Sequence, residues 1–397
     1  MTDSAKTPSF TDQRAIDHLL AFLKIEGLSG SEGAVAQEIR RRLEAAGCKK
    51  SWIRHDRVHK AIGQDYEVGN LIVRIPGTGA GRRAERRLLM GHMDTVPLCR
   101  GAVPKIEGDR IVSAGNTALG GDNRTSIGAL VTAIEAVLAS GVDRPPLTVL
   151  CTVGEEVGLL GARHVDPKDL GNPTLGFNVD SGDPRRVVYG AIGADRWTAN
   201  VFGRSSHAGV SPEDGISATL IAAKAIAAVA ERGFFGLIDA KGQRGTSNVG
   251  SIQGGEASNQ VTDHVVVTGE CRSHSKALLR RITSTYEREF ARAAKSVRSD
   301  SGECGRVEFV AETDYHAFKM PKSSPAVKLA SQKIREGGEE PILAIANGGL
   351  DANYINAKGI PTVTLGAGQH HPHTVDEYVD IPEYLGGCRL LTRLATL

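Results

Sequence analysis

The segment at residues 91–97, GHMDTVP, places an imidazole and a carboxylate two residues apart, directly after an apolar run. His92 and Asp94 follow RRLLM, which is typical of a buried strand. An imidazole can bind a metal ion while a neighbouring carboxylate accepts the other ring N–H and fixes the tautomer. Taken alone, the same pattern is also common in structured turns.

Further acidic and imidazole side chains follow three other predicted strands. They are Glu155 and Glu156 after LTVLCTV, Asp180 after LGFNV, and His370, His371 and His373 after TVTL. In open α/β sheets, ligands bind beyond the carboxyl ends of the strands, so these side chains could converge. Asp122, at the predicted start of a helix in LGGDNRTSIGAL, extends the set. Singly, such acids are often solvated pairs or helix caps, but four strand ends together favour a site.

Histidines and carboxylates suit a pair of divalent ions, and the absence of nearby cysteines favours a catalytic over a structural zinc site. Two such ions can polarise a carbonyl and generate hydroxide near neutral pH. The six cysteines are scattered without CxxC spacing, which predicts reduced thiols rather than a disulfide scaffold or a zinc finger.

Helices and strands alternate in the first part of the chain. Apolar residues recur at helical spacing from Ile16 to Leu23 and again from Val35 to Leu43, and Gly47 ends the second helix. Buried strands at NLIVRI, RRLLMGH, LTVLCTV and LGFNVD, with a helix at SIGALVTAIEAVLAS, predict an α/β domain with helices on both sheet faces. The glycine-rich PGTGAGRR precedes another strand rather than a helix, so we interpret it as a basic turn and not a phosphate loop.

From about Trp197 the pattern changes to strand, helix, strand, strand, helix, strand. The segments are WTANVFG, SATLIAAKAIAAVAE, SNVGSIQG, HVVVTGEC, KALLRRITSTYEREFARAAKSV and RVEFVAE. This βαββαβ order is typical of a ferredoxin-like unit. The α/β pattern then resumes with PAVKLASQKIRE and TVTL. We therefore predict a catalytic domain of residues 1–193 and 311–397 with an inserted α+β domain of residues 194–310.

Length and charge limit the class of protein. A chain of 397 residues exceeds the usual size of one core. Lysine and arginine total 48 against 46 acidic residues, and no long run of one sign favours nucleic acid or an anionic membrane as a partner. The N-terminus lacks a secretory pattern, and the longest apolar segment, ATLIAAKAIAAVA, is interrupted by Lys224, so we expect a cytoplasmic protein that acts on a small molecule.

The motifs occur in an order that resembles the M20 co-catalytic metallopeptidases, in particular their tripeptidase T-like branch. The matching segments are GHMDTV, LGGDNR, TVGEEVGLLGA, NVDSG, SSHAG, SNVGSIQGGEASNQV, ECRSH, GGLDANYINAKGIPTVTLG and HTVDEYV. The resemblance implies a zinc-exopeptidase-like catalytic domain, in which the inserted ferredoxin-like domain serves as a lid and dimerisation domain. It also implies a homodimer with two divalent ions, zinc before cobalt or manganese, that hydrolyses short peptides.

The resemblance also assigns roles within the first domain. It places one metal ion at His92, Asp122 and Asp180, and the second at Asp122, Glu156 and His373. Glu155 resembles the general base, and Asp94 the residue that orients His92. His373 is chosen over His370 and His371 because the family's ligand directly precedes Thr.

One further residue, His207, matches a catalytic position of the family, and three others match substrate positions. His207 in SSHAG resembles a donor to the developing oxyanion from across a dimer interface, with a loop cap as the alternative. Arg272 resembles a clamp for the substrate carboxylate, or else it pairs with Glu270. Asn259 resembles a polar cleft residue, with a turn as the alternative. Asp351 in NGGLDAN could hold a substrate α-amine or cap a turn.

Asn123, Thr125 and Ser126 depart from the family pattern and could alter the charge around the metal ligands. The predicted activity is release of the N-terminal residue from tripeptides. A carboxypeptidase, a dipeptidase or an N-acyl amino acid deacylase could use the same metal ions. A catalytically silent binding protein is an alternative of another class, although the base and all five ligand positions are present.

Overall fold

A computed structural model describes residues 8–63, 66–240 and 242–397 of the chain. Contacts divide the chain into two compact units, which we describe separately. Unit 1 comprises residues 1–190, 319–346 and 350–397, and unit 2 comprises residues 191–318 and 347–349. The strand that closes unit 2 continues to Tyr315, five residues beyond the predicted domain end at residue 310.

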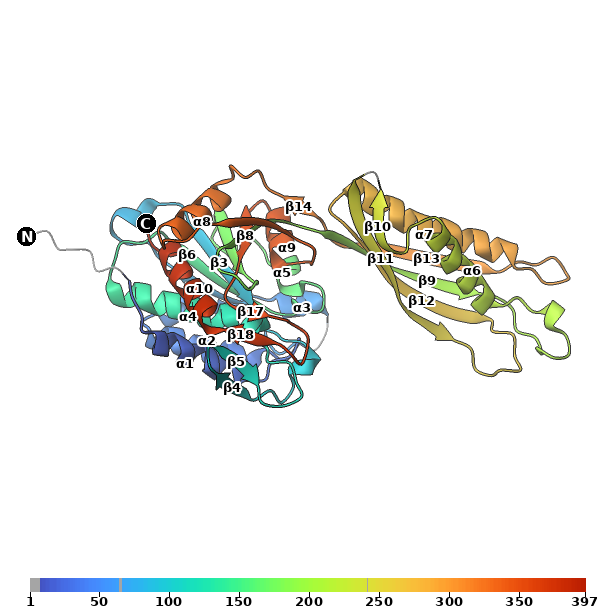
Figure 1. The fold of residues 1–397 in the computed structure, drawn as a ribbon, viewed down its shortest axis with the longest axis horizontal. Helices are drawn as coiled ribbons and strands as arrows, with labels where there is room; N and C mark the ends of the chain where they lie inside the picture. The colour runs from blue at the N-terminus through green and yellow to red at the C-terminus, as the bar shows by residue number, and fades with distance from the viewer. Residues whose placement is uncertain (1–7, 64–65, 241) are drawn as a thin grey trace, which may run out of the picture. The chain divides into compact units, whose positions relative to one another are not determined.

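Unit 1 is built on a mixed sheet of nine strands (Figure 1). The strands, in spatial order, are β1 (Ile53–His55), β2 (Leu71–Ile75), β6 (Leu147–Thr152), β3 (Arg87–His92), β7 (Leu175–Val179), β16 (Thr362–Leu365), β8 (Arg186–Ala191) and β14 (Phe318–Lys319), with β15 (Ile342–Ala346) paired to β8. The central strands β6, β3, β7 and β16 run parallel to one another. Their carboxyl ends therefore meet at one edge of the sheet.

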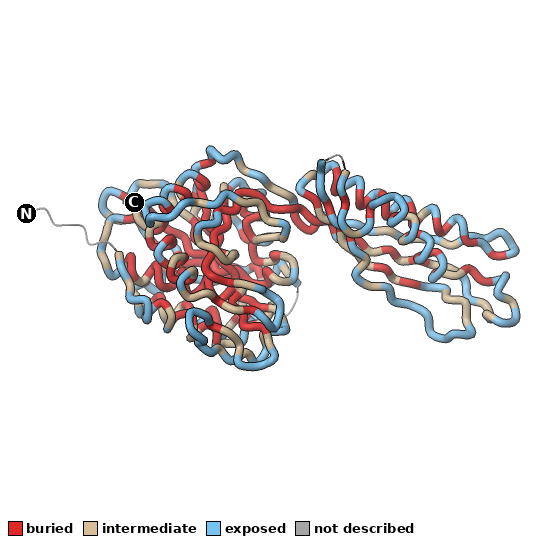
Figure 2. Tube along the Cα trace, viewed as in Figure 1, coloured by how far each residue is buried: buried red, intermediate tan, exposed pale blue. Residues whose placement is uncertain are grey.

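Helices cover both faces of this sheet, as predicted. One face carries Leu89 and Phe177 and packs against helices α1 (Asp12–Leu23), α2 (Gly33–Ala45), α4 (Gly121–Ser140), α8 (Pro325–Arg335) and α10 (Ile381–Leu394). The other face carries Leu88 and Met90 and packs against α5 (Leu160–His164) and α9 (Asp351–Ala357). The central strands β6 and β7 are buried along their whole length, and β3 is buried after Arg87 (Figure 2), which explains their continuous apolar runs.

Short elements of unit 1 have no clear sequence signal. A second sheet pairs β17 (Gln369–His370), β18 (Tyr378–Asp380), β5 (Arg110–Ser113) and β4 (Pro104–Glu107). These strands contain two to four residues, too few for a periodic pattern. Helix α3 (Val58–Ile62) has only five residues. The PGTGAGRR segment forms the 3₁₀ turn η2 (Gly79–Arg83) before β3, which agrees with its interpretation as a turn.

Unit 2 has the predicted βαββαβ order with one additional strand. Its sheet has the order β10 (Gly236–Ala240), β11 (Gln243–Gly254), β12 (His264–Ser273), β9 (Gly193–Phe202) and β13 (Arg306–Tyr315). Helices α6 (Ala218–Glu231) and α7 (Lys276–Ser296) pack together against the core around Trp197. The sequence did not predict β10, an edge strand of only five residues. The predicted role of this unit as a lid and dimerisation domain stays a prediction.

Candidate active site

Four ligand-bearing segments begin at the same edge of the unit 1 sheet. His92 is the last residue of β3, Asp180 directly follows β7, and Glu155 lies three residues after β6. His373 lies farther along the chain, after β16 and the short strand β17. Asp122 enters from the start of α4, which approaches β3 closely because Gly91 has no side chain that would overlap Ser126.

Asp122 lies between two histidines. Its Oδ1 is 3.1 Å from Nε2 of His92, and its Oδ2 is 3.6 Å from Nε2 of His373. His92 Nε2 is also 3.9 Å from Oδ1 of Asp180, while His373 Nε2 is 2.9 Å from Oε2 of Glu156. The ligand atoms of His92, Asp122 and Asp180 lie within 4.8 Å of one another, and so do those of Asp122, Glu156 and His373. We call these five residues the ligand cluster.

The three histidines after β16 have different surroundings. His370 donates or accepts a hydrogen bond with Glu383 at 2.6 Å, and its ring stacks on Tyr378. His371 also contacts the Tyr378 ring. His373 is the one whose ring nitrogen reaches the carboxylates of the ligand cluster.

Asp94 contacts both His92 and the turn that carries Glu155. The Nδ1 of His92 lies 3.1 Å from the backbone oxygen of Asp94 and 3.4 Å from its Oδ1, so the nearer acceptor is the carbonyl rather than the predicted carboxylate. The carboxylate of Asp94 instead accepts hydrogen bonds from the amides of Glu155 at 3.0 Å and Glu156 at 3.2 Å. Asp94 therefore holds the predicted base in place as well as the histidine.

Four polar residues that the sequence did not predict support this arrangement. Ser29 donates to Asp94 at 2.6 Å, and Glu32 accepts from the amide of Gly154 at 3.0 Å. Gln369 donates to Asp180 at 3.1 Å, and Glu377 accepts from the amide of Asp122 at 2.9 Å. None of the four directly follows one of the predicted strands. Only Glu377 falls within a matched motif, HTVDEYV, which gave the sole sequence signal.

Two departures from the family pattern have structural partners. Asn123 donates to the backbone oxygen of Val179 at 2.8 Å, which ties the start of α4 to the end of β7. The hydroxyl of Thr125 lies 3.1 Å from Oε1 of Gln369 and can donate to it, which turns the amide nitrogen of Gln369 toward Asp180. These departures leave the ligand cluster intact.

Buried negative charge dominates the electrostatics. Burial raises the pKa of Glu155 well above its usual range, and the charges of Asp180 and Asp351 add to this effect against that of His92. Burial and the charge of Asp122 likewise raise the pKa of Asp180 well above its usual range. Burial lowers the pKa of His92, but neighbouring carboxylates, Glu155 foremost, raise it to well above its ordinary value. Divalent cations would offset this excess of negative charge, so the donor set fits two metal ions that share Asp122.

The predicted substrate residues of unit 2 form two separate groups. His207 is exposed, and its Nδ1 accepts from the amide of Gly209 at 3.1 Å, so Nε2 carries the proton of the neutral ring. The exposed Asn259 lies beside it, because its backbone oxygen accepts from the amide of Ala208 at 2.9 Å. Arg272 is at the other end of the sheet, opposite Ala194 of β9.

Arg272 and Asp351 both have partners within their own units. The guanidinium of Arg272 makes two hydrogen bonds to Glu270, at 2.9 and 3.0 Å, which is the structural alternative stated above. Asp351 is buried, and its Oδ2 accepts from the hydroxyl of Thr152 at 2.5 Å. Its Oδ1 has no hydrogen-bond partner among the described residues.

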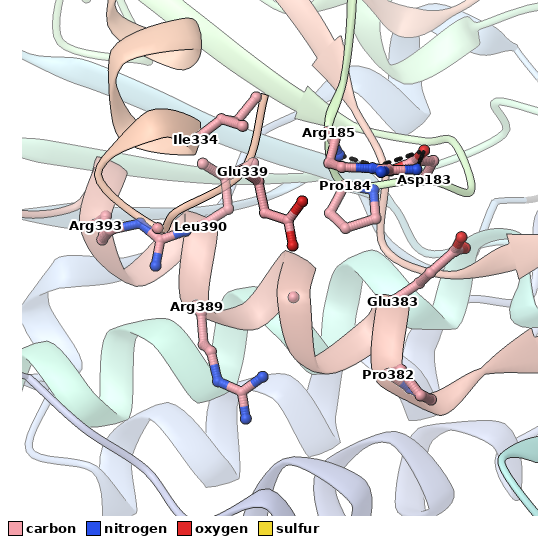
Figure 3. A pocket seen from close by; sticks show the side chains of 12 residues that line it. Asp183, Pro184, Arg185, Ile334, Glu339, Pro382, Glu383, Arg389, Leu390 and Arg393 are labelled. Carbon is pink, nitrogen blue, oxygen red and sulfur yellow. Dashed lines mark hydrogen bonds and ion pairs between the residues drawn. The ribbon is translucent and has the colours of Figure 1, made fainter. Parts of the chain in front are cut away.

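A separate pocket of about 330 Å³ opens between the loop after β7, the end of α8 and helix α10 (Figure 3). The carboxylate of Glu339 points into it, and Arg185 pairs with Asp183 at its rim at 2.8 Å. None of the predicted site residues lines this pocket. Within the described ranges, no helix has both the length and the apolar composition needed to cross a membrane.

Comparisons with known proteins identify the family of the chain. The model of peptidase family M20/M25/M40 matches residues 88–397. The uncharacterized protein YqjE of Bacillus subtilis is 30% identical over 373 residues, which cover 94% of this chain and 95% of that protein. Peptidase T of Clostridium botulinum is 26% identical over 303 residues, which cover 73% of this chain and 68% of that protein.

Two crystal structures resemble the chain over nearly its whole length. The aminopeptidase PepT from Bacillus cereus has a TM-score of 0.83 and 28% identity, and the match covers 97% of this chain and 98% of that chain. A tripeptidase from Staphylococcus aureus has a TM-score of 0.86 and 27% identity, with the same coverage of 97% and 98%. The chain therefore belongs to peptidase family M20/M25/M40, and it is a hydrolase that acts on peptide bonds.

Proposed function

We propose that the chain is a dinuclear metal-dependent aminopeptidase that releases the N-terminal residue of tripeptides. The observation that carries the proposal is the position of Asp122, whose two carboxylate oxygens face His92 and His373. The likeness to an aminopeptidase and to a tripeptidase supports the substrate class.

The ligand cluster would hold the two ions. His92, Asp122 and Asp180 would hold one, and Asp122, Glu156 and His373 the other, with zinc favoured by the mixed nitrogen and oxygen donors and cobalt or manganese as alternatives. When bound, two such ions polarise the scissile carbonyl and lower the pKa of an attacking water. Glu155, held by Asp94, takes the proton of that water and passes it to the leaving amine.

Residues outside the ligand cluster bind and orient the substrate. Asp351 holds the substrate α-amine, which its unpartnered Oδ1 supports. Arg272 binds the terminal carboxylate after exchanging its partner Glu270. His207 donates from Nε2 to the developing oxyanion, and Asn259 lies beside it to bind a polar group of the peptide.

The geometry of unit 2 supports a homodimer. Arg272 faces Ala194 at the start of β9, whereas His207 lies beyond Phe202 at the end of that strand. Eight residues of extended strand separate the two ends by about 26 Å. An extended tripeptide spans only about 10 Å. One short substrate can therefore contact both side chains only if they belong to different chains.

The proposal is tested with unblocked tripeptides, dipeptides and N-acetylated tripeptides, with chelator-treated enzyme before and after metal is restored. We expect metal-dependent release of the N-terminal residue from free tripeptides alone. Equal turnover of the acetylated peptides would reject the aminopeptidase assignment in favour of a deacylase or a carboxypeptidase. No turnover of any peptide would favour a silent binding protein.

A further inference from the structure

Glu377 makes three hydrogen bonds to the backbone that carries Asp122. Its Oε2 accepts from the amides of Leu119 and Gly120, each at 2.7 Å, and its Oε1 accepts from the amide of Asp122 at 2.9 Å. The Glu377 residue is only 2% exposed. Three hydrogen bonds from one buried side chain therefore tie this backbone to the segment that carries Glu377.

The backbone at the start of α4 needs an acceptor from elsewhere. The first amides of a helix have no partner within the helix, and the N-cap here is Gly120, which has no side chain to supply one. Gly120 has a φ of 82°, and Asp122 itself has non-helical angles of −81° and 101°. Glu377, 255 residues away from Asp122 in sequence, supplies the missing acceptor.

The same segment presents a ligand of the other proposed metal position. His373 precedes Glu377 by four residues, and the amide of Glu377 donates to the backbone oxygen of Thr374 at 3.2 Å. Thr374 in turn donates from its hydroxyl to the backbone oxygen of His371 at 2.8 Å. His371 and His373 have φ values of 52° and 63°, a region that residues other than glycine seldom adopt. Glu377 thus anchors an irregular loop on one side and the backbone of Asp122 on the other.

We propose that Glu377 is a positioning residue for the dinuclear site. It fixes the backbone of Asp122 relative to His373, so that one carboxylate faces both histidines. The inference rests on the proposed function, because it requires two ions that share Asp122. It differs from the role of a ligand, since the carboxylate of Glu377 is occupied by three amides.

The test uses Glu377→Gln and measures metal binding instead of peptide hydrolysis. An amide group matches the carboxylate in shape, but its nitrogen cannot accept, so at least one of the three N–H groups loses its partner. Co²⁺ is titrated into metal-free protein, and binding is followed by its visible absorption and by equilibrium dialysis. We expect affinity for at least one of the two ions to fall by about 10- to 100-fold, as for residues that support metal ligands.

Glu289→Gln is the matched control. Glu289 is also a buried glutamate, with its carboxylate 2.8 Å from Arg232, but it lies in α7 of unit 2. We expect its substitution to lower the melting temperature and to leave Co²⁺ affinity unchanged. Glu377→Asp keeps the charge and shortens the side chain, and it carries the same measurement if Glu377→Gln does not fold.

Two results overturn the inference in distinguishable ways. Wild-type affinity for both ions in the Glu377 variants, or an equal loss in Glu289→Gln, would reject the role of Glu377 alone. A wild-type chain that binds fewer than two Co²⁺ ions would reject the dinuclear site, and the role of Glu377 with it.

Discussion

The ligand cluster of unit 1 and the predicted substrate residues of unit 2 are assembled in opposite ways. In unit 1, strands β3, β6, β7 and β16 are parallel neighbours, so residues that follow their ends meet at one edge. In unit 2 all strands are antiparallel, and Arg272 and His207 lie at opposite ends of β9. A parallel sheet therefore concentrates strand-end residues, whereas an antiparallel sheet distributes them to two ends.

The two regions also differ in how firmly their residues are held. Asp94 and Glu155 are buried, and the amide of Glu155 is bonded to the Asp94 carboxylate. His207 is exposed, and Arg272 pairs with a side chain that substrate could replace. The proposed reacting groups are therefore buried and held by hydrogen bonds, whereas the proposed substrate contacts are more accessible to a change of partner.

Glu155→Gln should have the largest effect of the substitutions considered. A neutral amide cannot take a proton, so kcat should fall by about 10² to 10⁴-fold while two metal ions remain bound. Steady-state kinetics and metal analysis measure the two properties. Glu339→Gln, in the pocket of Figure 3, is the matched control and should leave both unchanged. Normal hydrolysis by Glu155→Gln would show that Glu155 is not the general base.

His207→Ala should lower kcat by about 10² to 10³-fold, as loss of an oxyanion donor does, with metal content unchanged. The variant is then mixed with Glu155→Gln under conditions of subunit exchange. If His207 acts on the partner's site, mixed dimers contain one complete site, and about a quarter of wild-type activity should return. Activity that stays at the level of the separate variants would contradict action between subunits.

Arg272→Lys should raise KM for tripeptides by about 10-fold with little change in kcat, because lysine cannot make two parallel bonds to a carboxylate. Tripeptide amides serve as the control, since they lack the terminal carboxylate. The variant should treat them as the wild-type enzyme does. An equal rise in KM for amides would leave Arg272 with its structural pairing to Glu270 as its only role.

The smallest effect concerns the stability of the metal-free protein. Burial raises the pKa of Glu32 from 4.5 to about 7. The folded state then binds more protons than the unfolded state, so stability falls as the pH rises from about 4.5 to 7 and stays low above that range. Glu32→Gln removes this contribution and keeps an acceptor for Gly154.

The measurement for Glu32 is thermal unfolding at pH 5.5 and pH 8 in the presence of chelator. The melting temperature of Glu32→Gln minus that of wild type should be several degrees higher at pH 8 than at pH 5.5. Glu67→Gln alters an exposed hydrogen bond to Gly33. Its melting temperature should change between pH 5.5 and pH 8 by the same amount as that of wild type. A relative gain at the lower pH would contradict the expected sign.

The sequence by itself determined the long helices and strands and the candidate reactive residues at the strand ends. Continuous apolar runs specified β3, β6 and β7, and helical spacing specified α1 and α2, because burial and periodicity are local properties of a segment. The positions of His92, Asp180 and Glu155 at or after strand ends predicted their convergence, since the parallel order of an α/β sheet follows from its alternating pattern.

Tertiary structure alone decided how these residues are supported. Ser29, Glu32, Gln369 and Glu377 act on backbone or side chains that are distant in sequence. Apart from the matched motif around Glu377, no local pattern distinguishes them from other polar residues. The edge strand β10 was not predicted because its five residues are too few for a clear periodic pattern. The wide separation of His207 and Arg272 follows from the pairing of the strands. The βαββαβ order of elements along the chain does not predict this pairing. Local physics thus specifies elements and reactive groups, whereas hydrogen bonds between distant segments specify their geometry.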